Sequence, residues 1–119
     1  MGLLDNFFGA REGFVKTLYK SGEKQYEGHI KDGKQYGLWT GFYESGQKKN
    51  EVHFEKGKKV GLNTIWFESG QKKGEERYKD DELDGSYTEW FEDGRVKYAA
   101  IFKDGVLVEK DGESANREQ

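Results

Sequence analysis

Short runs rich in aromatic and β-branched residues follow one another along most of this chain, separated by polar pairs that end in glycine. One run is Leu38–Tyr43, and residues 48–54 form the next run after the pair Ser45-Gly46. Aromatic and β-branched residues are enriched in β-strands, and a polar residue followed by glycine between two such runs is typical of a β-hairpin. The pattern therefore predicts an all-β protein built from hairpins.

The hairpins recur every 24 residues without insertion, which predicts a repeat array. The four blocks comprise residues 13–36, 37–60, 61–84 and 85–108. Two glycine columns mark them and are expected to be structural: Gly13, Gly37, Gly61 and Gly85 at the block openings, and Gly22, Gly46, Gly70 and Gly94 at the first turns. A second turn leads from each block into the next, so we expect a single up-and-down antiparallel twisted sheet.

The strand register follows from the lengths of the turns. If both turns contain two residues, Phe42 lies opposite Lys49. Gly37 then lies opposite Phe54, an arrangement in which an aromatic ring covers a bare glycine on the neighbouring strand. A three-residue turn with a glycine bulge would change the pairing and with it the assignment of side chains to faces.

This register assigns the side-chain columns to two faces. The first face carries Tyr19, Tyr43, Phe67 and Phe91 together with Ile30, Phe54, Tyr78 and Phe102. The second face carries Leu18, Phe42, Trp66 and Trp90, with Gln25, Lys49, Lys73 and Lys97 opposite them. Lysine side chains that lie over aromatic rings make cation–π contacts, so we expect such contacts on the second face.

Residues 1–12 and 109–119 lie outside the four blocks. The first segment carries Leu3, Leu4, Phe7 and Phe8 at the spacing of one helical face. It is expected to be either a cap, such as a short helix over the first edge of the sheet, or an amphipathic contact with a membrane or a partner. Residues 109–119 are predicted to be a polar tail.

Composition limits the classes of function. With 36% charged residues, 33% hydrophobic residues and no proline, the chain is too polar for an ordinary core, but 15% aromatic residues argue against disorder. A net charge of −3 disfavours a nucleic-acid binder. The charge is uneven, however, because residues 13–60 carry +4 and residues 61–108 carry −4. The absence of cysteine excludes disulfide and thiol chemistry and is compatible with a cytoplasmic protein.

No pattern in the sequence indicates catalysis, a cofactor or a metal. His29 and His53 occupy equivalent positions in successive blocks. Such positions lie two strands apart, roughly 9–10 Å, which is too far for both imidazoles to bind one zinc ion. The glycines fall at predicted turns and not in a phosphate-binding loop. We therefore expect a protein that is not an enzyme.

The recurring motif resembles the bacterial variant of the MORN repeat, as in the segment GLNTIWFESGQKK at residues 61–73. The likeness covers about residues 13–108, although block one departs at Lys16 and Leu18 and block four at Val96, Ala99 and Ala100. Proteins with this repeat look like the YwqK-type group of antitoxins and immunity proteins. The resemblance implies a non-catalytic protein that neutralises a toxin by direct binding. The alternative is a MORN-type scaffold that associates with membranes or assembles through its sheet edges.

The candidate partner-binding surface consists of exposed aromatic residues and the basic residues beside them, since aromatic and arginine side chains dominate protein interfaces. Its members are Phe42, Trp66, Trp90, Lys49, Lys73 and Arg77. The aromatic ladder of the first face, with Trp39 and Tyr87, is the competing surface. Most recurring residues are explained by the scaffold, so function is expected where the copies differ, as at Asn63, Glu76 and Arg77.

Overall fold

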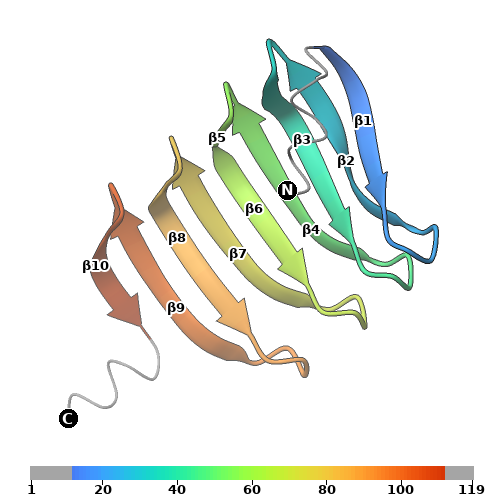
Figure 1. Ribbon diagram of the computed structural model, residues 1–119. Coiled ribbons are helices and arrows are strands. Elements are labelled where there is room, and N and C mark those ends of the chain that lie inside the picture. The colour runs from blue at the N-terminus through green and yellow to red at the C-terminus, as the bar shows by residue number, and fades with distance from the viewer. Residues whose placement is uncertain (1–11, 112–119) are drawn as a thin grey trace.

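The computed structural model describes residues 12–111, which form a single antiparallel sheet (Figure 1). The strands are β1 (Glu12–Leu18), β2 (Lys24–Lys31), β3 (Lys34–Phe42), β4 (Lys48–Glu55), β5 (Lys58–Lys59), β6 (Gly61–Trp66), β7 (Lys72–Lys79), β8 (Glu82–Trp90), β9 (Val96–Lys103) and β10 (Val106–Asp111). They pair in chain order, with β5 and β6 both beside β4. The described residues contain no helix, so the predicted all-β array of hairpins is confirmed.

The first turn of each block contains three residues, so the two-residue turn expected there is wrong. In block two the Gly46 N–H donates to the Tyr43 carbonyl oxygen at 2.9 Å, and the Tyr43 N–H donates to the Gln47 carbonyl oxygen at 2.9 Å. Gly46 has a φ of 95°, the left-handed conformation of a glycine bulge after a type I turn. The same pair of hydrogen bonds recurs in the other three blocks.

A bulge beside this turn confines the error in the predicted register to the residues next to the turn. Phe42 pairs with Lys48, one residue away from the expected Lys49. The register then shifts between Gly41 and Phe42, and from there Gly37 pairs with Phe54 as predicted. The extra residue changes the face of Lys49, because successive side chains of a strand point to opposite faces.

The second turn has two residues, as predicted. Glu55 pairs with Lys58 across the turn, and the two central residues have positive φ, 49° at Lys56 and 82° at Gly57. Two residues with positive φ form a type I′ turn, whose twist matches that of the flanking strands. The sequence therefore specifies these turns more reliably than the first ones.

Block three builds the same turn without glycine. Asp81 takes the place of the glycine with a φ of 72°, a conformation that aspartate adopts more readily than most residues. The Asp81 N–H donates to the Lys59 carbonyl oxygen at 3.0 Å, and the Lys59 N–H donates to Asp81 Oδ1 at 2.8 Å. These two hydrogen bonds join this turn to the turn of the preceding block and offset the backbone strain.

The glycines that open the blocks have a different role from the predicted one. Gly37 has a φ of 72°, and a Cβ atom built on it would meet no atom within 4 Å. Phe54 therefore pairs with Gly37 without covering it, and the expected stacking of a ring on this glycine is wrong. Gly37 instead lies in a bulge, where β3 has more residues than β2 between its pairs with His29 and Glu27.

A ring does cover a glycine elsewhere in the sheet. A Cβ atom at Gly28 would lie 2.3 Å from Cδ2 of Trp39. The indole is 4% exposed, and its Nε1–H donates to the His29 carbonyl oxygen at 3.0 Å. Trp39 packs against Ile30, which is 3% exposed, and these residues form the small hydrophobic core of the described residues.

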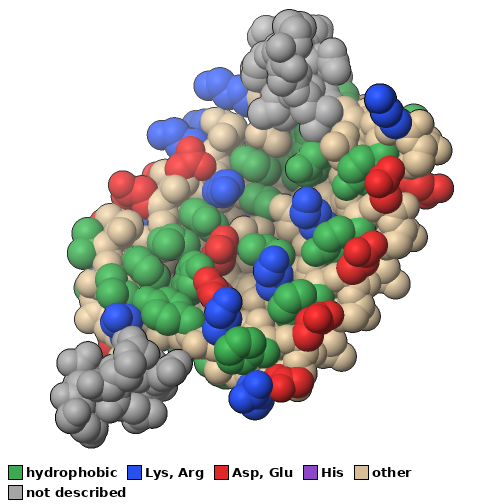
Figure 2. Space-filling model, turned by 60° about the horizontal axis from the view of Figure 1, so that its bottom comes forward, with side chains coloured by type: hydrophobic (Ala, Val, Ile, Leu, Met, Phe, Trp, Pro, Cys, Tyr) green, Lys and Arg blue, Asp and Glu red, His purple; other side chains and the backbone are tan. Residues whose placement is uncertain are grey.

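We call the side of the sheet that carries Trp39, Tyr87, Tyr43, Phe67 and Phe91 the core face. We call the other side, which carries Phe42 and Trp66, the ion-pair face. Figure 2 shows one side of the molecule, on which hydrophobic side chains extend along the array with charged side chains among and beside them. A sheet in one layer thus leaves most of its aromatic residues partly exposed.

Two terminal segments flank the four blocks. The capping or membrane role of residues 1–11, including Leu3, Leu4, Phe7 and Phe8, lies outside the described residues. At the other end β10 continues to Asp111, so Glu109 belongs to a strand and not to the polar tail expected from position 109.

Candidate functional site

The first turns place one lysine of each of three hairpins over an aromatic ring on the core face. These lysines were expected over Phe42, Trp66 and Trp90 on the opposite face, and that pairing is wrong because of the bulge described above. The observed pairs, with the distance from Nζ to the ring centroid, are Lys49 with Tyr43 at 5.7 Å, Lys73 with Phe67 at 5.6 Å and Lys97 with Phe91 at 5.8 Å. Cation–π contact was thus predicted correctly as chemistry but with the wrong partners.

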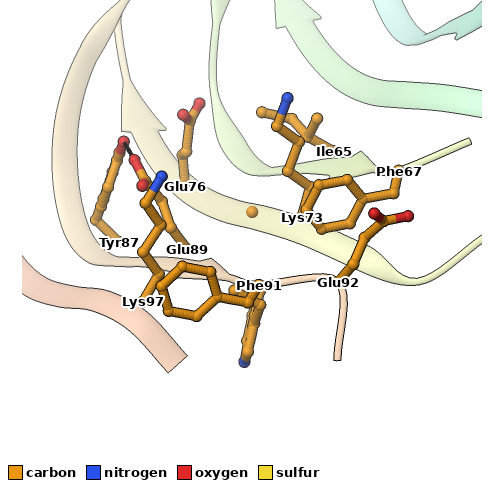
Figure 3. Close-up of a pocket in the computed structure, with 11 residues that line it drawn as sticks. Ile65, Phe67, Lys73, Glu76, Tyr87, Glu89, Phe91, Glu92 and Lys97 are labelled. Carbon is orange, nitrogen blue, oxygen red and sulfur yellow. Dashed lines mark hydrogen bonds between the residues drawn. The ribbon is translucent and has the colours of Figure 1, made fainter. Parts of the chain in front are cut away.

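A pocket of about 450 Å³ lies on the core face between β6, β7 and β8 (Figure 3). Phe67 and Phe91 border it with the lysines above them, and two carboxylates from neighbouring strands line it, Glu76 on β7 and Glu89 on β8. Tyr87 lines it as well. The pocket therefore combines apolar rings with acidic and basic groups.

Hydrogen bonds position both carboxylates. Glu76 Oε1 accepts from Asn63 Nδ2 at 2.8 Å and from the Tyr78 hydroxyl at 3.0 Å. Glu89 Oε2 accepts a hydrogen bond from the Tyr87 hydroxyl. These donors are neutral, so the carboxylates are oriented without being neutralised.

The tyrosines beside these carboxylates resist ionisation. Burial, followed by the charge and the hydrogen bond of Glu76, raises the pKa of Tyr78 to about 12. Burial, followed by the hydrogen bond and charge of Glu89, raises the pKa of Tyr87. Both hydroxyls therefore remain hydrogen-bond donors at neutral pH.

Neither carboxylate has a cationic partner within ion-pair distance among residues 12–111. The ion pairs of this part of the chain lie elsewhere, and Lys73 and Lys97 lie over rings instead. A partly buried carboxylate without a counter-ion favours binding of a positively charged group. The arrangement is suited to recognition of such a group.

The structure divides the predicted partner-binding residues between the two faces. Lys49 and Lys73 lie on the core face. Phe42, Trp66 and Arg77 lie on the ion-pair face, where Lys24 Nζ is 4.7 Å from the centroid of the Phe42 ring and Lys48 Nζ is 5.8 Å from that of Trp66. Trp90 pairs with Val96 at the end of β8 and also borders the pocket. The six residues thus do not form one surface.

Sequence reasoning did not assign the pocket residue Glu89 to a site, and it placed Tyr87 only on the competing aromatic surface of the first face. The signal for Glu76 was present, because it replaces Val52 of the preceding block in an otherwise apolar column. Glu89 is equivalent to Gly41 and Ile65, so it also departs from its column. Their proximity became visible only in the structure, where a bulge between β7 and β8 places Tyr87 opposite Glu76 and Glu89 opposite Gly74.

Two further features bear on the class of protein. No group of three or more His, Asp or Glu side chains among residues 12–111 is placed to hold a metal ion. His29 contacts the Phe14 ring, with centroids 5.1 Å apart, and His53 Nδ1 lies 3.3 Å from the Leu62 carbonyl oxygen. In the described part of the chain no helix is long and apolar enough to cross a membrane.

Three segments of the chain, residues 35–56, 59–80 and 83–104, match the model of the MORN repeat variant, and together they make up more than half of its length. The protein belongs to the MORN repeat variant family. Each MORN segment covers one hairpin from the end of a second turn to the next. A search of curated proteins found no match.

Residues 13–34 are not among the matched segments, yet they fold on the MORN plan. β1 pairs Gly13 with Ile30, just as β3 pairs Gly37 with Phe54 in the first matched segment. Family membership makes the protein a repeat module of a kind that is generally non-catalytic, and its individual function depends on the side chains that the repeat does not fix.

Proposed function

We propose that this protein is a non-catalytic binding module of the cytoplasm that neutralises a toxin by direct contact. The observation that supports binding most is the pocket with Glu76 and Glu89, two oriented carboxylates without a counter-ion. The likeness of the repeats to those of YwqK-type antitoxins supports a toxin as the partner. The acidic half of the array would attract a basic surface of that partner.

Rescue of growth tests this proposal. A toxic product of a neighbouring gene is expressed with and without this protein, and binding of the two purified proteins is measured by calorimetry. We expect rescue together with a complex of about 1:1 stoichiometry. Toxicity that persists despite equal expression of this protein, with no heat of binding for any neighbouring product, would contradict the proposal.

Substitutions on each face of the sheet then show which face binds the partner. Glu76→Gln with Glu89→Gln removes the two charges with little change of shape, and we expect a loss of affinity of at least roughly tenfold. Glu68→Gln is the matched control, because Glu68 is exposed at a first turn. If Trp66→Ala weakens binding and the double variant does not, the partner uses the ion-pair face, as the sequence predicted.

A further inference from the structure

The repeat neutralises partly buried glutamates on the ion-pair face but not on the core face. On the ion-pair face Lys72 Nζ lies 2.5 Å from the carboxylate of Glu75, three residues later, and the same pair recurs in blocks one and two. On the core face Lys73 precedes Glu76 by the same three residues, yet its Nζ lies 5.6 Å from the centroid of the Phe67 ring. The spacing that forms an ion pair on one face therefore leaves Glu76 without a counter-ion among residues 12–111.

Each pocket carboxylate keeps one oxygen free for a ligand. Glu76 Oε1 accepts two hydrogen bonds and Glu89 Oε2 accepts one, whereas Glu76 Oε2 and Glu89 Oε1 accept none from the described residues. Glu76 lies opposite Tyr87, two residues before Glu89, so the two glutamates are diagonal neighbours on adjacent strands. Diagonal neighbours in an antiparallel pair are about 7–8 Å apart. One planar group with several donors can bridge that separation.

A buried amide holds Glu76 in place at a cost in stability. Asn63 is 5% exposed, and its Nδ2 donates to Glu76 Oε1 at 2.8 Å. The buried Oδ1 of Asn63 has no hydrogen-bond partner in the described part of the chain. An unsatisfied buried acceptor lowers stability, and one block earlier the equivalent position carries the core residue Trp39. The polar arrangement around Glu76 is therefore not explained by the packing of the scaffold.

The pocket also has room that a side chain fills elsewhere on the core face. A Cβ atom at Gly28 would clash with the Trp39 ring, which covers that glycine. Gly74 lines the pocket, and a Cβ atom there would lie 3.5 Å from the Thr88 carbonyl oxygen and 3.8 Å from Ile65 Cδ1. No ring covers Gly74, so the floor of the pocket can accept further atoms.

These features favour a guanidinium over an ammonium group as the bound cation. A guanidinium is planar and carries five N–H donors, so one group can donate to both carboxylates. It is weakly hydrated and stacks on aromatic rings, which suits a pocket bordered by Phe67 and Phe91 (Figure 3). An ammonium is a compact, strongly hydrated charge. Lys73 and Lys97 already line the pocket, and both lie over rings without pairing with a carboxylate.

We propose that the core-face pocket binds an arginine side chain of a partner protein, with the guanidinium between Glu76 and Glu89. The aliphatic stem of this arginine lies against the Phe67 and Phe91 rings. The inference rests on the proposed function, because it takes the pocket as the contact surface, and it names the group that the partner inserts. Arginine is among the side chains that dominate binding energy when they fill a pocket at an interface.

Titration with capped arginine tests this proposal without a partner protein. Acetyl-arginine amide is added to the full isotope-labelled chain, and backbone amide signals are followed by NMR. We expect shifts at Gly74, Glu76 and Glu89 with a dissociation constant of about a millimolar, the range for a ligand of this size. Acetyl-citrulline amide has nearly the same shape without the charge. It should bind at least roughly tenfold more weakly, as should acetyl-lysine amide.

Two results of this titration overturn the proposal. One is the absence of shifts at the pocket up to the solubility limit of capped arginine. The other is equal binding of capped arginine and either comparison compound. Free arginine and agmatine distinguish a small molecule from a protein side chain as the source of the guanidinium. If either binds roughly a hundredfold more tightly than capped arginine, the pocket is a small-molecule site and a protein side chain is excluded.

Substitutions locate the bound arginine. Glu76→Gln and, separately, Glu89→Gln should each weaken arginine binding roughly tenfold. Gly74→Ala adds a methyl group to the pocket floor without a clash, so it should keep the fold and weaken binding. Glu68→Gln is the matched control and should leave binding unchanged, and circular dichroism should show that all variants remain β-structured. A control that weakens binding as much as the pocket variants would overturn the proposal, because general negative charge would then attract the arginine.

The outcome is separable from that of the proposed function, because the titration uses no toxin. Arginine binding without rescue of growth would keep the pocket as an arginine site and reject a toxin as the partner. Rescue of growth without arginine binding would keep the toxin and overturn the arginine site.

Discussion

Around Trp39 the core face is packed, whereas around Glu76 it is polar and open, although both regions are built from the same columns of the repeat. Trp39 covers Gly28, and its indole nitrogen is bonded to the backbone. One block later Asn63 occupies the position of Trp39 and bonds to Glu76. Two blocks later Tyr87 occupies it and bonds to Glu89, beside the pocket.

The difference shows that the repeat specifies the backbone and leaves the chemistry of the face to a few positions. Where a large ring meets a glycine on the neighbouring strand, the sheet has a core. Where the same columns carry carboxylates and amides, the face holds a pocket instead. A single-layer array can therefore concentrate its stability in one half and its binding groups in the other.

Among the substitutions that test this difference, removal of the Trp39 side chain should lower the free energy of unfolding most. Trp39→Ala deletes a side chain that is 4% exposed, and we expect a loss of about 3–5 kcal/mol in the free energy of unfolding. Tyr87→Ala, at the equivalent position, should cost less than half as much, because Tyr87 is only partly buried. Urea unfolding followed by circular dichroism measures both, and equal losses would contradict a core confined to the first half.

The close approach of Gly28 to Trp39 gives a second test. Gly28→Ala would place a Cβ atom 2.3 Å from the indole, and we expect a loss of about 1–3 kcal/mol. Gly74→Ala is the control in the acidic half, where the nearest atom would lie 3.5 Å away. The loss at Gly28 should shrink in a Trp39→Ala background, since the clashing ring is then absent. An unchanged loss there would assign the cost to the backbone.

Alkaline pH should lower the free energy of unfolding by a smaller amount, and part of this loss should arise in the acidic half of the array. Tyr78 has a pKa of about 12 in the folded protein against 10.0 in the unfolded chain. Its contribution is fully present below pH 10, since both states are then protonated, and it is lost as pH rises through 12 because the unfolded state releases the proton first. Tyr78→Phe should flatten the decline in unfolding free energy over this range, as measured by urea titrations at successive pH values. An identical slope in both proteins would show that other groups cause the decline.

The sequence predicted the period, the two-residue second turns and the aromatic columns, because each depends on local residue types with one dominant physical reason. The three-residue first turns could not be distinguished from two-residue turns, since Ser45-Gly46 suits both. That ambiguity of one residue moved Lys49 and Lys73 to the opposite face. The pocket was beyond prediction for another reason, because a bulge between β7 and β8 shifts Glu89 to a position opposite Gly74 and so brings it close to Glu76.

The smallest expected effect concerns hydrogen bonds that tyrosines of blocks one and two donate to the block that follows each of them. The Tyr43 hydroxyl donates to the Trp66 carbonyl oxygen at 2.7 Å, and the Tyr19 hydroxyl donates to the Phe42 carbonyl oxygen at 2.5 Å. Phe67 is the equivalent residue in block three and has no hydroxyl. Tyr43→Phe should cost about 1 kcal/mol, the usual net value of one such hydrogen bond.

The opposite substitution, Phe67→Tyr, adds a hydroxyl to the equivalent ring and so distinguishes the hydrogen bond from ring packing. Residue 67 precedes Trp90 by the same number of residues as Tyr43 precedes Trp66. The new hydroxyl of Phe67→Tyr is therefore equivalent to that of Tyr43, and the Trp90 carbonyl oxygen is the equivalent acceptor. We expect the substitution to stabilise the protein by up to about 1 kcal/mol and to slow amide hydrogen exchange in β8 and β9. These strands would then exchange more like those of the first half. A loss of stability in both variants would instead mean that ring packing, and not the hydroxyl, distinguishes the two halves at this column.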